Sequence, residues 1–329
     1  MDTSKVILEV KNLSKIYTTK KTEVKALSGV SFTVREGETI GIVGESGCGK
    51  TTLGRSIVRG IDATGGEVLL HTEDGVIDFL KATREQMKKY RRDIQMIFQD
   101  PYASLDPRMT VFDIISEPLR YNGGMSKSEI EQAVNQIAEQ VGLNKALLRR
   151  YPHAFSGGQR QRIGIARSLI LQPKIIVCDE AVSALDVSIQ AQIINLLEDL
   201  QREFKLTYLF ISHALSVVRH ISDRVLVMYL GRAVEFADTE DLFSAPLHPY
   251  TKALLSAAPH PDPDVKVSRI MLEGEVPNPA DPPTGCHFHP RCPYKTARCE
   301  REYPPFEEHG KGHFAACWNL SPDGEGIGE

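Results

Sequence analysis

A glycine-rich segment at residues 44–51 has residue types and a spacing that predict phosphate chemistry. It reads Gly-Glu-Ser-Gly-Cys-Gly-Lys-Thr and fits the pattern G-x-x-x-x-G-K-[ST]. In this pattern backbone N–H groups surround a phosphate chain, the lysine reaches its β and γ groups, and the hydroxyl holds Mg²⁺. We expect nucleotide contacts from Gly44, Glu45, Ser46, Gly47, Cys48, Gly49, Lys50, Thr51 and Thr52. The segment therefore predicts a site for ATP or GTP.

Two carboxylates end an apolar run further along the chain. Residues 174–180 read Lys-Ile-Ile-Val-Cys-Asp-Glu. This arrangement would let Asp179 assist the Mg²⁺ while Glu180 polarises the attacking water. Any buried strand can end in acids, so the pair alone fits a structural role equally well. The phosphate loop upstream favours hydrolysis.

The elements that must position these groups alternate between strands and helices. The phosphate loop follows a strand at 39–43 and precedes a helix at 50–59. Other short strands are expected at 7–10, 30–34, 67–70 and 94–98. After residue 155, helices at 157–171, 188–204 and 215–221 alternate with strands at 175–179, 207–212 and 224–230. Such alternation predicts a mainly parallel sheet with helices on both faces.

Between these regions the periodicity is helical, from about residue 111 to residue 149. Within 126–141 the apolar residues recur at i, i+4, i+7 and i+11, which places them on one helix face. They are Ile130, Val134, Ile137 and Val141. The pattern predicts a helical insert that separates Lys50 from the residues after position 155.

Composition excludes several classes of protein. Hydrophobic residues make up 41% of the chain and charged residues 25%, which is ordinary for a globular protein. The net charge of −4 provides no overall positive field for nucleic acid or anionic lipid. The longest apolar runs fall far short of the roughly 18 residues that span a bilayer. Residues 1–11 are charged and alternating, unlike a signal peptide, so we expect the chain to stay in the cytoplasm.

At residues 155–159 the chain reads Phe-Ser-Gly-Gly-Gln, which resembles the signature motif of the ATP-binding cassette (ABC) family. Further motifs of that family follow in order at sensible spacing. Gln99 matches the Q-loop, Ser183–Asp186 the D-loop, His213 the switch histidine, and Tyr17 the aromatic residue that stacks on adenine. The resemblance covers about Val6 to Ala257.

The resemblance implies an α/β fold: a P-loop NTPase cassette with a RecA-like core, an antiparallel β subdomain and a helical subdomain at about 100–160. It implies Mg²⁺ held by Thr51, Gln99 and Asp179, and catalysis by Glu180 and His213. Ser156, Gly157, Gly158 and Gln159 would contact ATP bound to a partner subunit, and Asp186 would belong to the D-loop. Each ATP then lies between two cassettes arranged head to tail, so one cassette alone hydrolyses ATP poorly.

Three of these residues have ordinary alternative interpretations. A lone histidine such as His213 usually serves packing or lies on the surface, an exposed tyrosine such as Tyr17 often ends a strand, and Gln99 could be a turn residue.

Two positions depart from the family pattern. Ala181 replaces a common proline and Ala214 a common aspartate. Loss of an aspartate before the helix at 215–221 removes a cap worth about 1 kcal/mol, so we expect a looser switch segment and an effect on turnover.

The last part of the chain has a different composition. Eleven of the 19 prolines lie between residues 259 and 305, and four of the six cysteines lie nearby, at Cys286, Cys292, Cys299 and Cys317. Four clustered thiolates in a cytoplasmic chain indicate a metal rather than disulfides. They suit tetrahedral Zn²⁺ or an iron–sulfur cluster, and unligated cysteines remain an alternative.

Residues 283–293, together with His248-Pro-Tyr250, resemble the C-terminal extension of oligopeptide and dipeptide importer ATPases, some of which hold a 4Fe-4S cluster there. The resemblance favours 4Fe-4S over Zn²⁺. We therefore expect an ABC nucleotide-binding domain at 1–258 and a loop-rich, cysteine- and proline-rich extension at 259–329.

The resulting hypothesis is an ATPase subunit that energises peptide import across the cytoplasmic membrane, bound to its inner face. Its expected partners are a second, non-identical ATPase subunit, two membrane permease subunits and an extracytoplasmic solute-binding protein. Oligosaccharide, nickel or glutathione are alternative substrates, since the cassette does not touch the substrate. A soluble ABC ATPase acting on nucleic acid would carry two cassettes or a long coiled coil, and a small-molecule kinase would not explain the signature or His213.

Overall fold

The computed structural model describes residues 5–18, 22–257 and 270–320. Its contacts divide the chain into two compact units. Unit 1 contains Lys5, Arg35–Glu38 and Lys81–Ile211. Unit 2 contains the described residues of Val6–Val34, Thr39–Leu80 and Ser212–Glu329.

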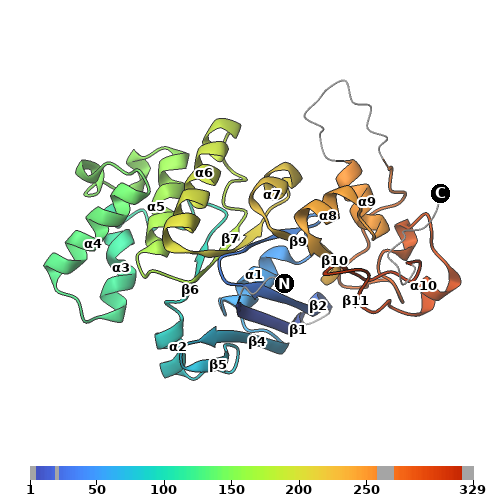
Figure 1. Ribbon diagram of the computed structural model, residues 1–329. Helices are drawn as coiled ribbons and strands as arrows, with labels where there is room; N and C mark the ends of the chain where they lie inside the picture. The colour runs from blue at the N-terminus through green and yellow to red at the C-terminus, as the bar shows by residue number, and fades with distance from the viewer. Residues whose placement is uncertain (1–4, 19–21, 258–269, 321–329) are drawn as a thin grey trace. The chain divides into compact units, whose positions relative to one another are not determined.

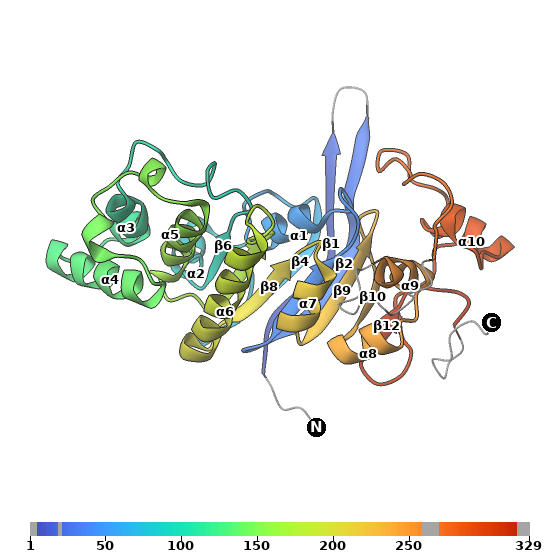
Figure 2. The ribbon, with the colours of Figure 1, turned by 90° about the horizontal axis from the view of Figure 1, so that it is seen from above.

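Unit 2 contains an antiparallel sheet of four strands in the order β2-β1-β4-β5. Their bounds are β1 Val6–Thr18, β2 Glu23–Arg35, β4 Gly65–Thr72 and β5 Gly75–Asp78. Figure 2 shows β1 and β2 side by side as long strands. Leu8, Val10 and Leu13 of β1 are buried, whereas the exposed residues of the strand are polar or aromatic, as expected for a sheet with one face on a core.

A second group of strands in unit 2 carries the phosphate loop. β3 (Thr39–Val43) pairs in parallel with β9 (Arg224–Tyr229), and β9 pairs antiparallel with β10 (Arg232–Asp238). All residues of β3 and β9 are buried. The helices of this unit are α1 Lys50–Ile57, α7 Leu215–Ile221, α8 Thr239–Ser244 and α9 Pro249–Ser256. Among them α7 packs on β3, where Gly41 leaves room for Val218 and Ser222.

The described part of the C-terminal extension joins this strand group. β12 (Phe314–Ala315) pairs antiparallel with β10, and β11 (Glu307–Glu308) pairs with β12. The remaining regular elements there are short, η3 His289–Arg291 and α10 Ala297–Arg301, and most residues of 270–320 lie outside helices and strands. The expected boundary at 258/259 lies outside the described residues.

Unit 1 contains three parallel strands in the order β8-β7-β6. Their bounds are β6 Ile94–Ile97, β7 Ile175–Asp179 and β8 Thr207–Ile211. The helices are α2 Arg84–Tyr90, α3 Val111–Asn122, α4 Lys127–Gln140, α5 Gly157–Leu169 and α6 Val187–Phe204, with short turns η1 Lys145–Leu147 and η2 Pro152–Ala154. In Figure 1, α5 lies between α3 and the strands, and it packs on both α3 and β6.

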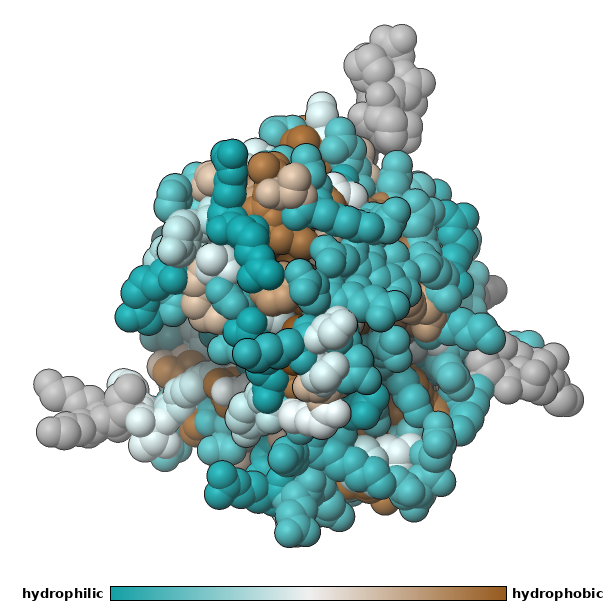
Figure 3. All heavy atoms as spheres, turned by 90° about the vertical axis from the view of Figure 1, so that its left-hand side faces the viewer, coloured by the Kyte–Doolittle hydropathy of each residue, from teal (hydrophilic) through white to brown (hydrophobic). Residues whose placement is uncertain are grey.

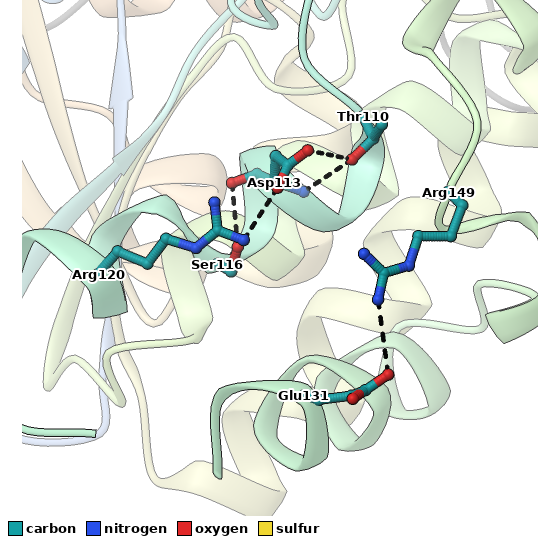
Figure 4. A network of polar contacts seen from close by, with 6 residues as sticks. All are labelled: Thr110, Asp113, Ser116, Arg120, Glu131 and Arg149. Atoms are coloured by element: carbon teal, nitrogen blue, oxygen red, sulfur yellow. Dashed lines mark hydrogen bonds and ion pairs between the residues drawn. The ribbon is translucent and has the colours of Figure 1, made fainter. Parts of the chain in front are cut away.

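The helical insert is held by capped helices and a polar network (Figure 4). Thr110 caps α3, and its hydroxyl contacts the Asp113 carboxylate at 2.6 Å. Arg120 donates to the same carboxylate at 2.9 Å. The Thr110 hydrogen bond, together with Arg120, lowers the pKa of Asp113 although partial burial acts to raise it. Arg149 forms an ion pair with Glu131 of α4 at 3.6 Å.

Most of the strands and helices expected from the sequence are confirmed. The face of α4 is as predicted, since Ile130, Val134, Ile137 and Val141 are all buried. The structure adds elements that the sequence patterns did not indicate: β5, α2, β10, α8 and α9. Within the described residues, no helix is long and apolar enough to cross a membrane.

Candidate nucleotide site

The phosphate loop lies in unit 2 between β3 and α1, as predicted. The Lys50 Nζ is buried and donates to the carbonyl oxygens of Gly44 and Glu45 at 2.8 and 3.0 Å. Gly49 has a φ of 106°, and a Cβ there would lie 2.5 Å from the Ala26 carbonyl oxygen. The loop path therefore requires glycine at this position.

The predicted carboxylates lie in unit 1, where β7 ends. Asp179 is fully buried as the last residue of the strand. Glu180 follows with a φ of 47°, and its backbone N–H donates to the Ile211 carbonyl of β8 at 3.0 Å. This backbone, rare for a residue with a Cβ, is a strained conformation of the kind found at functional sites.

The structure brings Gln99 to Glu180, although 81 positions separate them. The Nε2 of Gln99 donates to the Glu180 Oε2 at 2.7 Å. The contact arises because β6 and β7 are parallel neighbours, with Ile97 opposite Cys178, so both residues follow strands that end at the same edge. Gln99 and Glu180 can therefore act on one group at that edge.

The signature residues form the start of α5 in unit 1. Ser156 caps the helix, and Ser156 and Gln159 form a reciprocal capping box. Gly158 is buried against Ile189 of α6. Asp186, the expected D-loop residue, caps α6 by accepting from the backbone N–H of Ile189 at 3.0 Å. The two motifs therefore open two helices that pack on each other.

His213 and Tyr17 belong to unit 2, like the phosphate loop. His213 follows β8 and is exposed. Tyr17 lies near the end of β1, 41% exposed, with the Lys15 Nζ 4.9 Å from the centre of its ring. The predicted site residues are thus divided between the units. Unit 2 contains the phosphate loop, Tyr17 and His213, and unit 1 contains Gln99, Asp179, Glu180, Ser156–Gln159 and Asp186.

Two residues beyond the cassette motifs contact the phosphate loop within unit 2. The Tyr250 hydroxyl accepts a hydrogen bond from the backbone N–H of Glu45 at 2.8 Å. The Arg291 Nη1 donates to both carboxylate oxygens of Glu45, at 3.2 and 2.9 Å. Burial acts to lower the pKa of Arg291, but hydrogen bonds to Glu45 and Tyr229 outweigh it and the pKa is raised. Arg291 therefore carries its charge at the loop.

An aromatic cluster holds these two residues. Phe288, only 1% exposed, lies edge-on to Tyr229 and Tyr250, with ring centres 5.4 and 5.5 Å apart. Tyr229 and Tyr250 are themselves 4.7 Å apart. The side chain of Arg291 is 9% exposed beside this cluster. The segment at 288–291 is thereby fixed against the body of unit 2.

A buried glutamate, Glu235 of β10, connects the same region to the extension. Its carboxylate accepts from the backbone N–H groups of Leu247 and His248 at 2.7 and 2.9 Å. It also lies 2.7 Å from the Nε2 of His313, just before β12. Burial lowers the pKa of His248 to about 4, so its neutral ring accepts from the backbone N–H of Tyr250.

The four clustered cysteines are free thiols that influence one another. Burial raises the pKa of Cys286 to about 12, and nearby Cys299, Cys317 and Cys292 act in the same direction. The backbone N–H of Cys286 donates to the Cys299 carbonyl at 2.8 Å. Within the described residues, no group of three or more potential ligands is placed to hold a metal ion.

Comparison with known proteins places the chain in a family. Residues 27–183 match the family described as ABC transporter, and residues 234–299 match the oligopeptide/dipeptide transporter C-terminal region. An oligopeptide transport ATP-binding protein, AppF of Bacillus subtilis, is 51% identical over 94% of this chain and 96% of its own length. The oligopeptide transport ATP-binding protein OppF of Escherichia coli is 50% identical over 97% of this chain and 95% of its own length. The chain belongs to the ABC transporter family.

Solved structures of ABC proteins have a fold similar to that of this chain. The dimeric cassette MJ0796, bound to ADP and Pi in a post-hydrolysis state, is 29% identical with a TM-score of 0.63 and covers 71% of this chain and 99% of its own. The cbiO1 protein of Clostridium perfringens, part of the ABC transporter complex cbiONQ, is 28% identical with a TM-score of 0.63. It covers 73% of this chain and 91% of its own. The α/β fold is thus the ABC cassette predicted from the motifs, and the chain is an ATPase.

The two departures from the ABC pattern have different surroundings. Ala181 is buried, with 2% of its surface exposed. Ala214 stands at the N-cap of α7 with no side-chain cap, as the sequence predicts. The Ser212 hydroxyl accepts a hydrogen bond from the backbone N–H of Ala214 at 3.0 Å, so this donor in the turn before the helix has a partner.

The sequence patterns did not indicate the contact of Arg291 with Glu45 in the phosphate loop, or the buried Glu235 that joins β10 to the extension. Tyr250 was noted only within a motif that resembles the transporter extension. Arg291 lies 246 positions from Glu45, and no spacing rule connects residues so distant. The only available signal was its place between Cys286 and Cys292 in an unusual segment.

Proposed function

We propose that this ATPase binds ATP with Mg²⁺ and hydrolyses it to energise peptide import. Oligopeptide transport and peptide import are what the names of its relatives state, and this supports peptides over oligosaccharide, nickel or glutathione. The observation that carries hydrolysis is the position of Glu180, which follows a buried strand in a constrained backbone and accepts a hydrogen bond from Gln99.

In this proposal the residues act by positioning and charge stabilisation, as in other phosphoryl transfers. The phosphate-loop residues from Gly44 to Thr52 cradle the phosphates, and Glu180 orients or deprotonates the water. His213 contacts the γ-phosphate and Tyr17 stacks on the base. Thr51, Gln99 and Asp179 offer hydroxyl, amide and carboxylate oxygens, the donors that suit Mg²⁺, and would hold an ion that, when bound, would neutralise charge on the phosphates.

The second half of each site comes from another cassette. Ser156 and Gln159 are exposed at the start of α5, where backbone N–H groups and the helix dipole favour an anion. Together with Gly157, Gly158 and the D-loop Asp186, they would face ATP bound to a partner subunit. A dimeric ABC cassette among the similar structures supports this arrangement. We propose a non-identical partner.

Replacing Glu180 with glutamine tests the catalytic assignment. In the assembled transporter, the Glu180→Gln variant is expected to bind ATP with wild-type affinity and to lose at least about 99% of its turnover. Binding is measured by titration with Mg·ATP, and turnover by phosphate release. Retained turnover would contradict the role given to Glu180.

A groove within unit 1 supports a docking site for the permease subunits. Two adjoining hollows, of about 640 and 830 Å³, lie between α2, α3 and the end of α5. Leu119, Leu171 and the exposed Tyr121 line them together with Lys88 and Arg92. Figure 3 shows the face that carries α3 and α4, where apolar atoms surface between hydrophilic ones. Docking there would hold the chain at the inner face of the membrane, opposite a solute-binding protein.

We also propose that the extension, residues 259–329 beside an ABC domain at 1–258, holds a 4Fe-4S cluster through Cys286, Cys292, Cys299 and Cys317. The support is the chemistry of the donor set, four free thiols 31 positions apart at most that raise one another's pKa, although the described residues do not place them together as a metal-binding group. The same thiols suit Zn²⁺, which is the alternative. Such a metal would order the loop-rich segment.

A further inference from the structure

We propose that Arg291, from the cysteine-rich extension, is a positioning residue of the nucleotide site, which raises ATP affinity by neutralising Glu45 and fixing the phosphate loop. Tyr250 assists it. The inference rests on the proposed role of the phosphate loop in binding ATP. It assigns to the extension a part in the nucleotide site itself, in addition to any metal it holds.

The first support is the pairing of Arg291 with a carboxylate inside the phosphate loop. Glu45 directly follows Gly44, and its side chain is 28% exposed. One guanidinium nitrogen of Arg291 contacts both of its oxygens, at 3.2 and 2.9 Å. A carboxylate at this place repels a phosphate chain bound in the loop, and a charge-assisted pair with arginine removes most of that repulsion.

The second support is that Arg291 is held rigidly, with 9% of its side chain exposed. Its Nη1 also lies 3.4 Å from the Tyr229 hydroxyl, and the adjacent Phe288 is packed among aromatic rings. A fixed cation loses little side-chain entropy when it pairs, so the interaction is stronger than that of an exposed ion pair.

The third support is a second contact on the same loop residue. The Tyr250 hydroxyl accepts from the backbone N–H of Glu45 at 2.8 Å, so the side chain and the backbone of Glu45 are both fixed. Tyr250 is positioned in turn by His248, whose backbone N–H donates to Glu235. Because Glu235 also contacts His313, the loop is connected to the extension at two places.

Through Arg291, the cysteines are separated from the phosphate loop by a single residue that contacts the loop. Arg291 immediately precedes Cys292, and the segment between Cys286 and Cys292 contains both Phe288 and Arg291. A change in the backbone of that segment would therefore move the guanidinium that faces Glu45. The extension can in this way transmit its own state to the nucleotide site.

The test compares the affinity of the full-length chain for Mg·ATP in six variants. Arg291→Gln is expected to weaken ATP binding about tenfold, the loss that follows when a charge-assisted bond is removed. Because the harm arises from uncompensated Glu45, the double variant Glu45→Gln/Arg291→Gln should bind ATP within about twofold of Glu45→Gln alone. In the assembled transporter, Arg291→Gln should raise the KM for ATP while kcat changes less than about twofold.

The matched control is Arg298→Gln. Arg298 belongs to the same extension and also pairs with a carboxylate, Glu302 at 3.1 Å, and it stacks over Trp318. Its removal should leave ATP affinity unchanged. Tyr250→Phe, which deletes only the hydroxyl, should weaken ATP binding. Without nucleotide, this variant should be at least as thermally stable as Arg291→Gln.

Lys50→Ala distinguishes a failure of the proposed role of the phosphate loop from a failure of the role given to Arg291. If Lys50→Ala binds ATP normally, the role of the phosphate loop is wrong. If Lys50→Ala loses binding while Arg291→Gln keeps it, only the present inference is overturned. The inference is also overturned if the double variant is as weak as Arg291→Gln, or if Arg291→Gln and the double variant both fail to fold, since Arg291 then serves packing alone. If the double variant folds and Arg291→Gln does not, the result supports the charge pairing between Arg291 and Glu45.

Discussion

Two consecutive glycines, Gly157 and Gly158, open α5, and their surroundings leave them different amounts of room. A Cβ at Gly158 would lie 2.5 Å from the Cγ2 of Ile189, a branched atom close to its own backbone. At Gly157 the nearest side-chain atom would be the Cδ2 of Leu185 at 3.6 Å, an ordinary contact. The signature therefore needs its second glycine for helix packing, independently of any contact with nucleotide.

This difference predicts unequal effects on stability. Gly158→Ala should lower the free energy of unfolding by about 1–3 kcal/mol, because α5 and α6 must move apart to accept the methyl group. Gly157→Ala, the matched control, should change it by less than about 0.5 kcal/mol. Urea unfolding of the nucleotide-free chain measures both. Equal losses would show that packing against Ile189 is not the reason for the glycine.

At the scale of elements, α4 shows how local sequence signals start a helix. Ser126 caps the helix by accepting from the backbone N–H of Glu129, and the carboxylate of Glu129 accepts from the backbone N–H of Ser126 at 2.6 Å. The capping interaction also lowers the pKa of Glu129. Because both partners are three positions apart, the sequence alone contains the information for this start.

Removal of the cap should therefore be measurable. Ser126→Ala is expected to cost about 1 kcal/mol of stability, since the backbone N–H of Glu129 at the start of α4 loses its hydrogen-bond acceptor. Ser128→Ala, at an exposed position two residues into the same helix, should change stability by less than about 0.5 kcal/mol. Thermal unfolding of both variants compares them. A loss at Ser128 as large as that at Ser126 would exclude the cap as the cause.

At the scale of the whole molecule, the extension depends on the rest of unit 2 for its order. Residues 270–320 contain only short regular elements, and they join the core through β12 on β10 and through His313 on Glu235. Phe288 is the residue of this segment most deeply inserted among the aromatic side chains. A metal on the cysteines would provide a third connection within the same segment.

The metal proposal predicts a stoichiometric result. Full-length protein purified without oxygen should contain about four iron and four sulfide per chain, and lose both when Cys292 is replaced by serine. Chelation should then lower the melting temperature of the unit that contains the extension, because metal binding is linked to folding. One zinc per chain without sulfide would support the alternative site. Absence of iron, sulfide and zinc with the cysteines intact would exclude a metal.

The sequence predicts much of the fold because its signals are local. The apolar face of α4, its cap, and the strand at Ile175–Asp179 each depend on residues only a few positions apart. The phosphate loop and the signature could be recognised for the same reason. The strands β5 and β10 were missed because their bounds depend on pairing with partners, such as β4 and β9, and not on a clear alternation.

The pairings that complete the site could be read only from the folded chain. Gln99 meets Glu180 because β6 and β7 are parallel neighbours, and Arg291 meets Glu45 across 246 positions. Residue types and spacing do not encode such contacts, since they arise when separate elements bury their apolar faces together. The motifs of this ATPase are therefore legible in its sequence, whereas the link between its cysteine-rich extension and its phosphate loop depends on the packing around Phe288.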